Sequence, residues 1–133
     1  MIPVDWSATR LFLHVLAATV WVGGQLTLAA LIPVLRSAGS DLPRLAARRF
    51  NRIGWPAYGV LIITGAWNVV AERDRLHGHF AATLAVKIAV VALSGVLAYW
   101  HTRVAGASRI ALLGAFSGLF AITALFLGIL LAG

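Results

Sequence analysis

Residues 11–35 read LFLHVLAATVWVGGQLTLAALIPVL, an almost unbroken apolar run that also contains His14, Trp21 and Gln25. A helix needs roughly 20 apolar residues to cross the hydrocarbon core of a bilayer, and this run is long enough. An ionisable side chain inside such a helix is costly, and it marks a functional-site hypothesis by default. The run therefore predicts a membrane-spanning helix, and His14 is the residue around which we look for a site.

The composition of the whole chain predicts an integral membrane protein. Of its 133 residues, 61% are hydrophobic and 11% are charged, and the mean hydropathy is +0.92. A soluble domain of this length needs more charged residues on its surface. The formal net charge of +7 does not indicate nucleic-acid binding, because the basic residues lie in short segments between apolar runs. The first run is too long for the core of a cleavable signal peptide, so we expect it to stay in the protein.

Four apolar segments predict one domain, an all-α integral membrane four-helix bundle. A short polar lead precedes the first helix, and a loop over residues 36–52 follows it. Within that loop, residues 42–51 favour a short amphipathic helix on the membrane surface, because arginines there alternate with apolar side chains. The helices are expected near residues 9–35, 53–71, 80–100 and 110–132.

The distribution of arginine predicts how the helices are oriented. Four spans place both termini on one side of the membrane, and cytoplasmic loops carry an excess of Lys and Arg. We therefore expect both termini on the extracytoplasmic side of a bacterial-type inner membrane. The loops expected in the cytoplasm hold seven arginines and the opposite side holds three: Arg36, Arg44, Arg48, Arg49, Arg52, Arg103 and Arg109 against Arg10, Arg73 and Arg75.

The chain lacks the soft ligands that many metal sites use. It has no cysteine, and its single methionine is Met1. Thiolate ligation and c-type haem attachment are therefore excluded, as is thioether ligation within the membrane. Any metal must be held by imidazole, carboxylate, amide or amine groups.

Depth along the helices indicates which polar side chains can meet. At about 1.5 Å per residue, His14 and Lys87 lie roughly 9 to 10 Å inside the extracytoplasmic face, and Asn68 lies roughly 5 to 10 Å inside it. His77 and His79, in the adjoining loop ERDRLHGH at residues 72–79, are expected near the same level. His101 lies roughly 21 Å deeper than Lys87, so it cannot share a metal with His14 in one protomer.

Helical periodicity places these polar residues on three stripes that we expect to face the bundle interior. The stripes consist of His14, Trp21 and Gln25; of Thr83, Lys87, Ser94 and His101; and of Thr64, Asn68 and Glu72.

Each candidate also has a purely structural alternative. His14 is either a ligand or a neutral histidine bonded to a neighbouring helix. Lys87 either serves the site or extends its amine to the outer interface. Trp21 either contacts a cofactor or packs beside the adjacent glycines. His77 and His79 either bind a metal or are solvated loop residues.

Three segments are informative about family: HVLAATVWVGG at 14–24, RRFNRIGWPAYGVLIITG at 48–65 and LAVKIAVVALSGVLAYWH at 84–101. Through them the chain resembles the copper resistance D (CopD) membrane domain family over residues 11–103. These segments are also distantly similar to HemJ-type protoporphyrinogen oxidases. The resemblance implies a four-helix membrane unit in which His14 and Lys87 handle the metal or cofactor.

Three functions are compatible with these patterns. The first is copper binding and transport across the inner membrane, with His14, His77 and His79 as metal ligands. The second is a haem b redox protein, in which His14 is the axial ligand, Lys87 offsets a propionate, and Trp21 and Asn68 contribute to the cofactor site. The third is a non-catalytic subunit of a membrane complex. In each case the bilayer surrounds the helices, and Gly114 and Gly118 favour a homodimer or larger complex through the fourth helix.

Overall fold

The computed structural model describes residues 5–133, and residues 1–4 of the predicted lead lie outside the described residues. Within residues 5–133 every regular element is a helix. Four continuous helical stretches are long and apolar enough to cross a membrane, at Trp6–Ala38, Leu42–Ala71, Gly78–His101 and Ala107–Ala132. The prediction of an all-α, multi-pass membrane protein with four spanning helices is confirmed. The chain divides into a first unit that ends at Ala71 and a second unit from Glu72 to Gly133.

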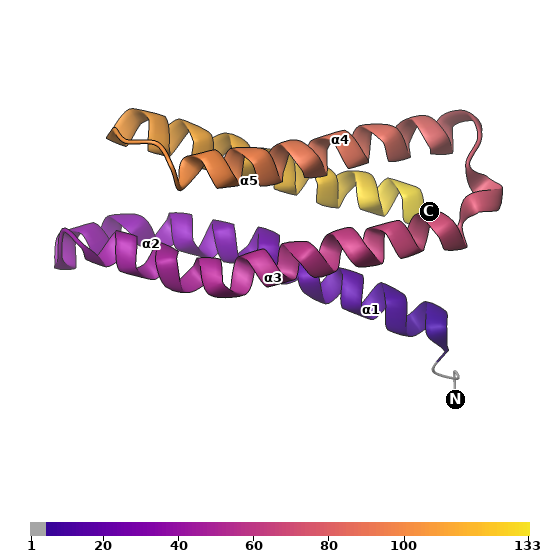
Figure 1. Ribbon diagram of the computed structural model, residues 1–133, viewed down its shortest axis with the longest axis horizontal. Helices are drawn as coiled ribbons and strands as arrows, with labels where there is room; N and C mark the ends of the chain where they lie inside the picture. The colour runs from indigo at the N-terminus through magenta and orange to yellow at the C-terminus, as the bar shows by residue number, and fades with distance from the viewer. Residues whose placement is uncertain (1–4) are drawn as a thin grey trace. The chain divides into compact units, whose positions relative to one another are not determined.

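The first span consists of three consecutive helical elements. They are α1 (Trp6–Ala18), the π-helical turn η1 (Thr19–Gly23) and α2 (Gly24–Ala38), and they follow one another without a break (Figure 1). The Asp5 side chain accepts a hydrogen bond of 2.8 Å from the backbone N–H of Ala8. An N-terminal cap of this kind satisfies an otherwise unpaired N–H group, so the helix begins at Trp6 instead of near residue 9.

The second span, α3 (Leu42–Ala71), is 30 residues long and pairs with α2 (Figure 1). The sequence predicted its start near residue 53, after a long loop, but the structure leaves only residues 39–41 between α2 and α3. Packing explains the earlier start. The Phe50 ring occupies the space where a Cβ of Gly24 would lie, so the first turns of α3 lie directly against α2.

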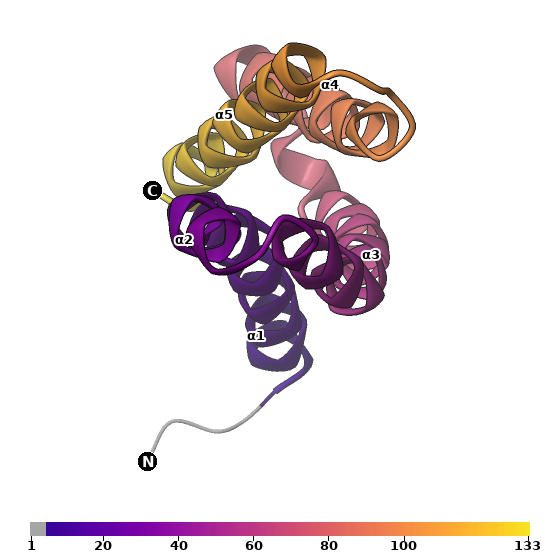
Figure 2. The same cartoon turned by 90° about the vertical axis from the view of Figure 1, so that its left-hand side faces the viewer.

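The second unit contains the short 3₁₀ turn η2 (Arg73–Arg75) and two long helices, α4 (Gly78–His101) and α5 (Ala107–Ala132). The two long helices lie side by side in both views (Figures 1 and 2). At the centre of their interface Ser94 Oγ donates to the carbonyl oxygen of Ser117 at 3.0 Å, and Ser117 Oγ donates to that of Ser94 at 2.9 Å. Both serines are buried, so this pair of bonds fixes the register of α4 against α5.

Candidate functional site

The His14 side chain points from α1 to α3. Its Nδ1 atom lies 2.8 Å from Oγ1 of Thr64, a residue with only 3% of its surface exposed. The sequence placed His14 and Thr64 on two of the helical stripes that were expected to face the bundle interior. In the structure these two residues contact each other, and the imidazole is held between α1 and α3.

The Thr64 hydroxyl determines which imidazole nitrogen carries the proton. Its Oγ1 lies 2.7 Å from the carbonyl oxygen of Val60 and donates its single proton there. The hydroxyl must therefore accept from Nδ1–H of His14. In the neutral imidazole the lone pair then resides on Nε2. Metal-binding histidines are oriented in the same way, by a hydrogen bond from the nitrogen that does not bind the metal.

The surroundings of the His14 ring on α3 are small and polar. A Cβ on Gly65 would lie 3.7 Å from His14 Cε1, so the ring lies at van der Waals distance over this glycine. Asn68 follows Thr64 by one turn on the same face of α3. Its Oδ1 atom is buried and has no hydrogen-bond partner among residues 5–133. The α1–α3 interface therefore offers one imidazole nitrogen and one amide oxygen from neighbouring helices.

Arg10 is a residue of this region that the sequence interpretation missed. It was counted among the charges outside the membrane, but it lies in α1 and only 5% of its surface is exposed. Arg10 precedes His14 by four residues, so the two side chains share one face of the helix. That spacing was the signal available in the sequence. The polar part of α1 thus extends one turn further out than predicted.

Trp21 belongs to an aromatic cluster next to the π-helical turn. Its ring centroid lies 4.7 Å from that of Tyr58 and 5.5 Å from that of Trp55, both on α3. Only 4% of Trp21 is exposed. These separations are typical of packed aromatic pairs, so they agree with the packing alternative. A contact between Trp21 and a cofactor stays a prediction.

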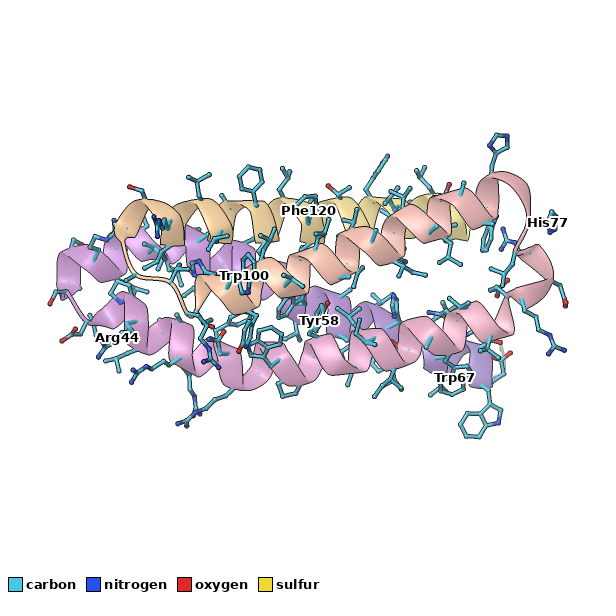
Figure 3. All side chains as sticks on the ribbon, turned by 45° about the horizontal axis from the view of Figure 1, so that its top comes forward. Arg44, Tyr58, Trp67, His77, Trp100 and Phe120 are labelled. Carbon is cyan, nitrogen blue, oxygen red and sulfur yellow. The ribbon has the colours of Figure 1, made fainter. Side chains whose placement is uncertain are left out.

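The side chains drawn in Figure 3 place Tyr58 in the middle part of α3, with Arg44 and Trp67 toward its opposite ends. The Trp67 ring lies 6.4 Å from the ring of Trp6, which is 77% exposed. Tryptophan is enriched at membrane–water interfaces. Arg44 and Trp67 therefore lie near opposite ends of α3.

His77 and His79 lie in the second unit. His77 is the residue before α4, it makes no capping hydrogen bond through its side chain, and both histidines are exposed. Across residues 5–133 no group of three His, Asp or Glu side chains is arranged to hold a metal ion. A shared site with His14 would join the two units, and it stays a prediction.

Three residues of the predicted stripe on α4, Lys87, Ser94 and His101, contact α5. Lys87 Nζ would lie 2.9 Å from a Cβ on Gly128, so the amine lies against the α5 backbone at this glycine. His101 Nδ1 donates to the carbonyl oxygen of Ile110 at 2.6 Å, and its ring covers Gly114. Gly114 is therefore in contact with α4 of its own chain. The proposed meeting of Lys87 with His14 joins the two units and stays a prediction.

These features define a multi-pass membrane protein made of two helical units, the first of which carries an oriented imidazole between two spanning helices. Comparison with known proteins finds no matching family model, no matching curated protein and no matching solved structure. The resemblance to the CopD and HemJ families therefore stays a prediction from the residues that carry it.

Proposed function

We propose that this chain handles copper ions in the membrane, with Nε2 of His14 as a ligand of the ion. The observation that carries the proposal is the pair of hydrogen bonds from His14 to Thr64 and from Thr64 to Val60. They favour a neutral imidazole with its lone pair on Nε2, which is the form that binds a metal.

The available ligand atoms suit a copper ion that is bound only while it crosses the membrane. Imidazole nitrogen and amide oxygen are ligands that Cu(II) accepts, and His14 and Asn68 supply them from adjacent helices. An ion that crosses a membrane must be bound weakly enough to leave again, so a site with few protein ligands is appropriate. The exposed His77 and His79 are proposed to bind the ion at the surface. The predicted resemblance to the CopD family supports the same function.

Haem b binding is the second candidate, because it requires only one imidazole ligand from the protein. No cluster of three His, Asp or Glu side chains occurs in the described part of the chain, and a haem needs only one protein imidazole because the porphyrin supplies four nitrogens. His14, oriented through Nδ1, fits an axial ligand, and Lys87 would offset a propionate. A bound haem would supply one-electron redox chemistry.

An optical spectrum of the purified full-length protein separates the two candidates. Haem binding predicts a Soret band that is lost in His14→Ala. Copper handling predicts a colourless protein that binds added Cu(II). The electron paramagnetic resonance spectrum of the bound Cu(II) should show nitrogen hyperfine structure, and this structure should be weaker in His14→Ala. The Cu(II) bound by the His77→Ala/His79→Ala variant shows how much of the binding depends on His14 and how much on the two surface histidines.

His101→Gln is the matched control, because His101 also donates through Nδ1 to an acceptor on a neighbouring helix but lies in the second unit. His101→Gln should leave the Soret band or the Cu(II) hyperfine structure as it is in the wild type. A colourless wild-type protein that binds no more Cu(II) than His14→Ala would contradict both candidates and support a subunit without metal chemistry.

A further inference from the structure

The length of α3 exceeds what the membrane requires. Its 30 residues extend about 45 Å at about 1.5 Å per residue, whereas the hydrocarbon core is about 30 Å thick. Roughly the first ten residues therefore project from the hydrocarbon. This projecting part, which we call the arginine segment, comprises residues 42–52 and contains Arg44, Arg48, Arg49 and Arg52.

One side of the arginine segment is fixed to the first unit. The Phe50 ring lies against Gly24 of α2 and Gly54 of α3 itself. The segment is thus helical and packed before any ligand binds. A preorganised site loses less conformational entropy when it binds its ligand.

The opposite side of the segment is basic and exposed. With about 100° between successive residues, Arg44, Arg48 and Arg52 fall within about 80° of one another, and Arg49 lies about 60° beyond Arg52. All four arginines are exposed. Leu45 and Ile53 lie on the same side and are 54% and 56% exposed. The outward side therefore combines guanidinium groups with apolar side chains.

The four guanidinium groups have no acidic partner within residues 5–133. Asp41 is the closest acidic residue in the sequence, and it forms no ion pair with them. By contrast, Arg73 and Arg75 in η2 lie 4.0 Å from Asp74 and 3.6 Å from Glu72. The positive charge of the arginine segment is thus available to an anion from outside the chain.

We propose that the arginine segment is a binding site for anionic phospholipids in the leaflet at that end of α3. The planar guanidinium groups of Arg44, Arg48 and Arg52 bind the headgroup phosphates through paired N–H donors, a geometry that lysine lacks. Leu45 and Ile53 contact the upper part of the acyl chains. The site is independent of the copper or haem proposal, because it lies at the end of α3 that is remote from Thr64.

The test uses the full-length protein in nanodiscs that contain phosphatidylglycerol and phosphatidylcholine. Native mass spectrometry counts the lipids of each kind that remain bound. We expect the wild type to retain phosphatidylglycerol preferentially, with the preference reduced at high salt. Each basic residue near an anionic surface contributes roughly fivefold in binding, so Arg44→Gln/Arg48→Gln/Arg52→Gln should lower the preference by roughly a hundredfold.

Two further variants separate lipid binding from membrane insertion. Arg73→Gln/Arg75→Gln removes arginines that already have acidic neighbours, so it should keep the wild-type preference. Arg44→Lys/Arg48→Lys/Arg52→Lys keeps the charge that orients the helices but lacks the planar donors, so we expect an intermediate preference. Equal retention of both lipids by the wild type, or an unchanged preference in the glutamine or lysine triple variant, would overturn the proposal.

Discussion

The imidazole of His14 donates its Nδ1 proton to the Thr64 hydroxyl, and that hydroxyl donates its own proton to the Val60 carbonyl. A rigid element, the backbone of α3, thus orients a ring on α1 through one side chain. Without this relay an imidazole in a spanning helix could adopt either tautomer and several rotamers. With it, the ring is held in one orientation and the neutral imidazole carries its proton on Nδ1.

Replacing Thr64 tests whether this relay serves binding. Thr64→Val keeps the side-chain shape but removes the acceptor for His14 Nδ1–H. Loss of the group that orients a metal-binding histidine typically weakens metal affinity 10- to 100-fold, so we expect about that loss for Cu(II) or haem. The measurement is a binding titration of the purified protein.

The control for this variant is Thr123→Val on α5. Thr123 also donates to a carbonyl oxygen of its own helix, Leu119 at 2.9 Å, but it lies in the other unit. It should bind metal as the wild type does, and Thr64→Ser should restore most of the affinity. Wild-type affinity in Thr64→Val would show that the relay is only structural.

The pH dependence of binding tests the proposed role of Nε2. A metal and a proton compete for this lone pair, so metal binding releases a proton whenever the free imidazole is charged. Affinity should therefore be highest when the imidazole is neutral and should fall as the pH decreases. In the acidic range the loss should approach about tenfold per pH unit for one competing proton.

The surface histidines must be removed for this measurement, so it is made in His77→Ala/His79→Ala. Titrations between about pH 5 and 8 cover the range in which histidine ordinarily changes its charge. An affinity that rises as the pH decreases would contradict competition between the metal and a proton for the imidazole.

Periodicity was sufficient to predict which helix faces pack inward. Lys87 and Ser94 recur on one side of α4, and both contact α5. His14 and Thr64 were each placed on a stripe expected to face inward, and they form a hydrogen bond. These predictions succeed because a helix has a fixed rise and a fixed rotation per residue.

The features that were not predicted depend on contacts between segments distant in sequence. The π-helical turn carries Trp21, which packs against Trp55 and Tyr58 of another span. The early start of α3 depends on Phe50 and Gly24, which are also on different helices. Residues 42–51 were predicted to form a separate amphipathic helix on the membrane surface, whereas in the structure they are the first turns of the continuous helix α3.

The contact of Phe50 with Gly24 predicts a difference between two adjacent glycines. In Gly24→Ala the new methyl group would overlap the Phe50 ring, whereas nothing lies within 4 Å of a Cβ on Gly23. We expect Gly24→Ala to lower the free energy of unfolding by about 1 to 3 kcal/mol, a typical cost of overpacking. Gly23→Ala should be neutral or stabilising, because alanine favours a helix more than glycine does.

Both glycine variants are compared by reversible unfolding in mixed detergent micelles. The double variant Gly24→Ala/Phe50→Ala removes the overlap. Gly24→Ala should therefore lower the free energy of unfolding by less in the Phe50→Ala background than in the wild type. Equal stability of Gly23→Ala and Gly24→Ala would refute the contact between Phe50 and Gly24.

The two serines at the α4–α5 interface predict a specific pattern of additivity. Each hydroxyl donates to the backbone carbonyl of the other serine, so the two bonds share no atom. Ser94→Ala removes one bond and Ser117→Ala removes the other. Interhelical hydrogen bonds in membranes contribute about 0.6 kcal/mol on average and up to about 1.7 kcal/mol. We expect each single variant to lose stability in this range.

The double variant Ser94→Ala/Ser117→Ala should lose about the sum of the two single losses. A direct bond between the two hydroxyl groups would behave differently, because either single variant would then cost as much as the double variant. Ser37→Ala is the matched control, since its hydroxyl bonds to Val34 of its own helix and not to a neighbouring helix. Forced unfolding of the full-length protein in bicelles gives all four free energies. Strong non-additivity would mean that the two serines interact through their hydroxyl groups instead of through two separate bonds to carbonyl oxygens.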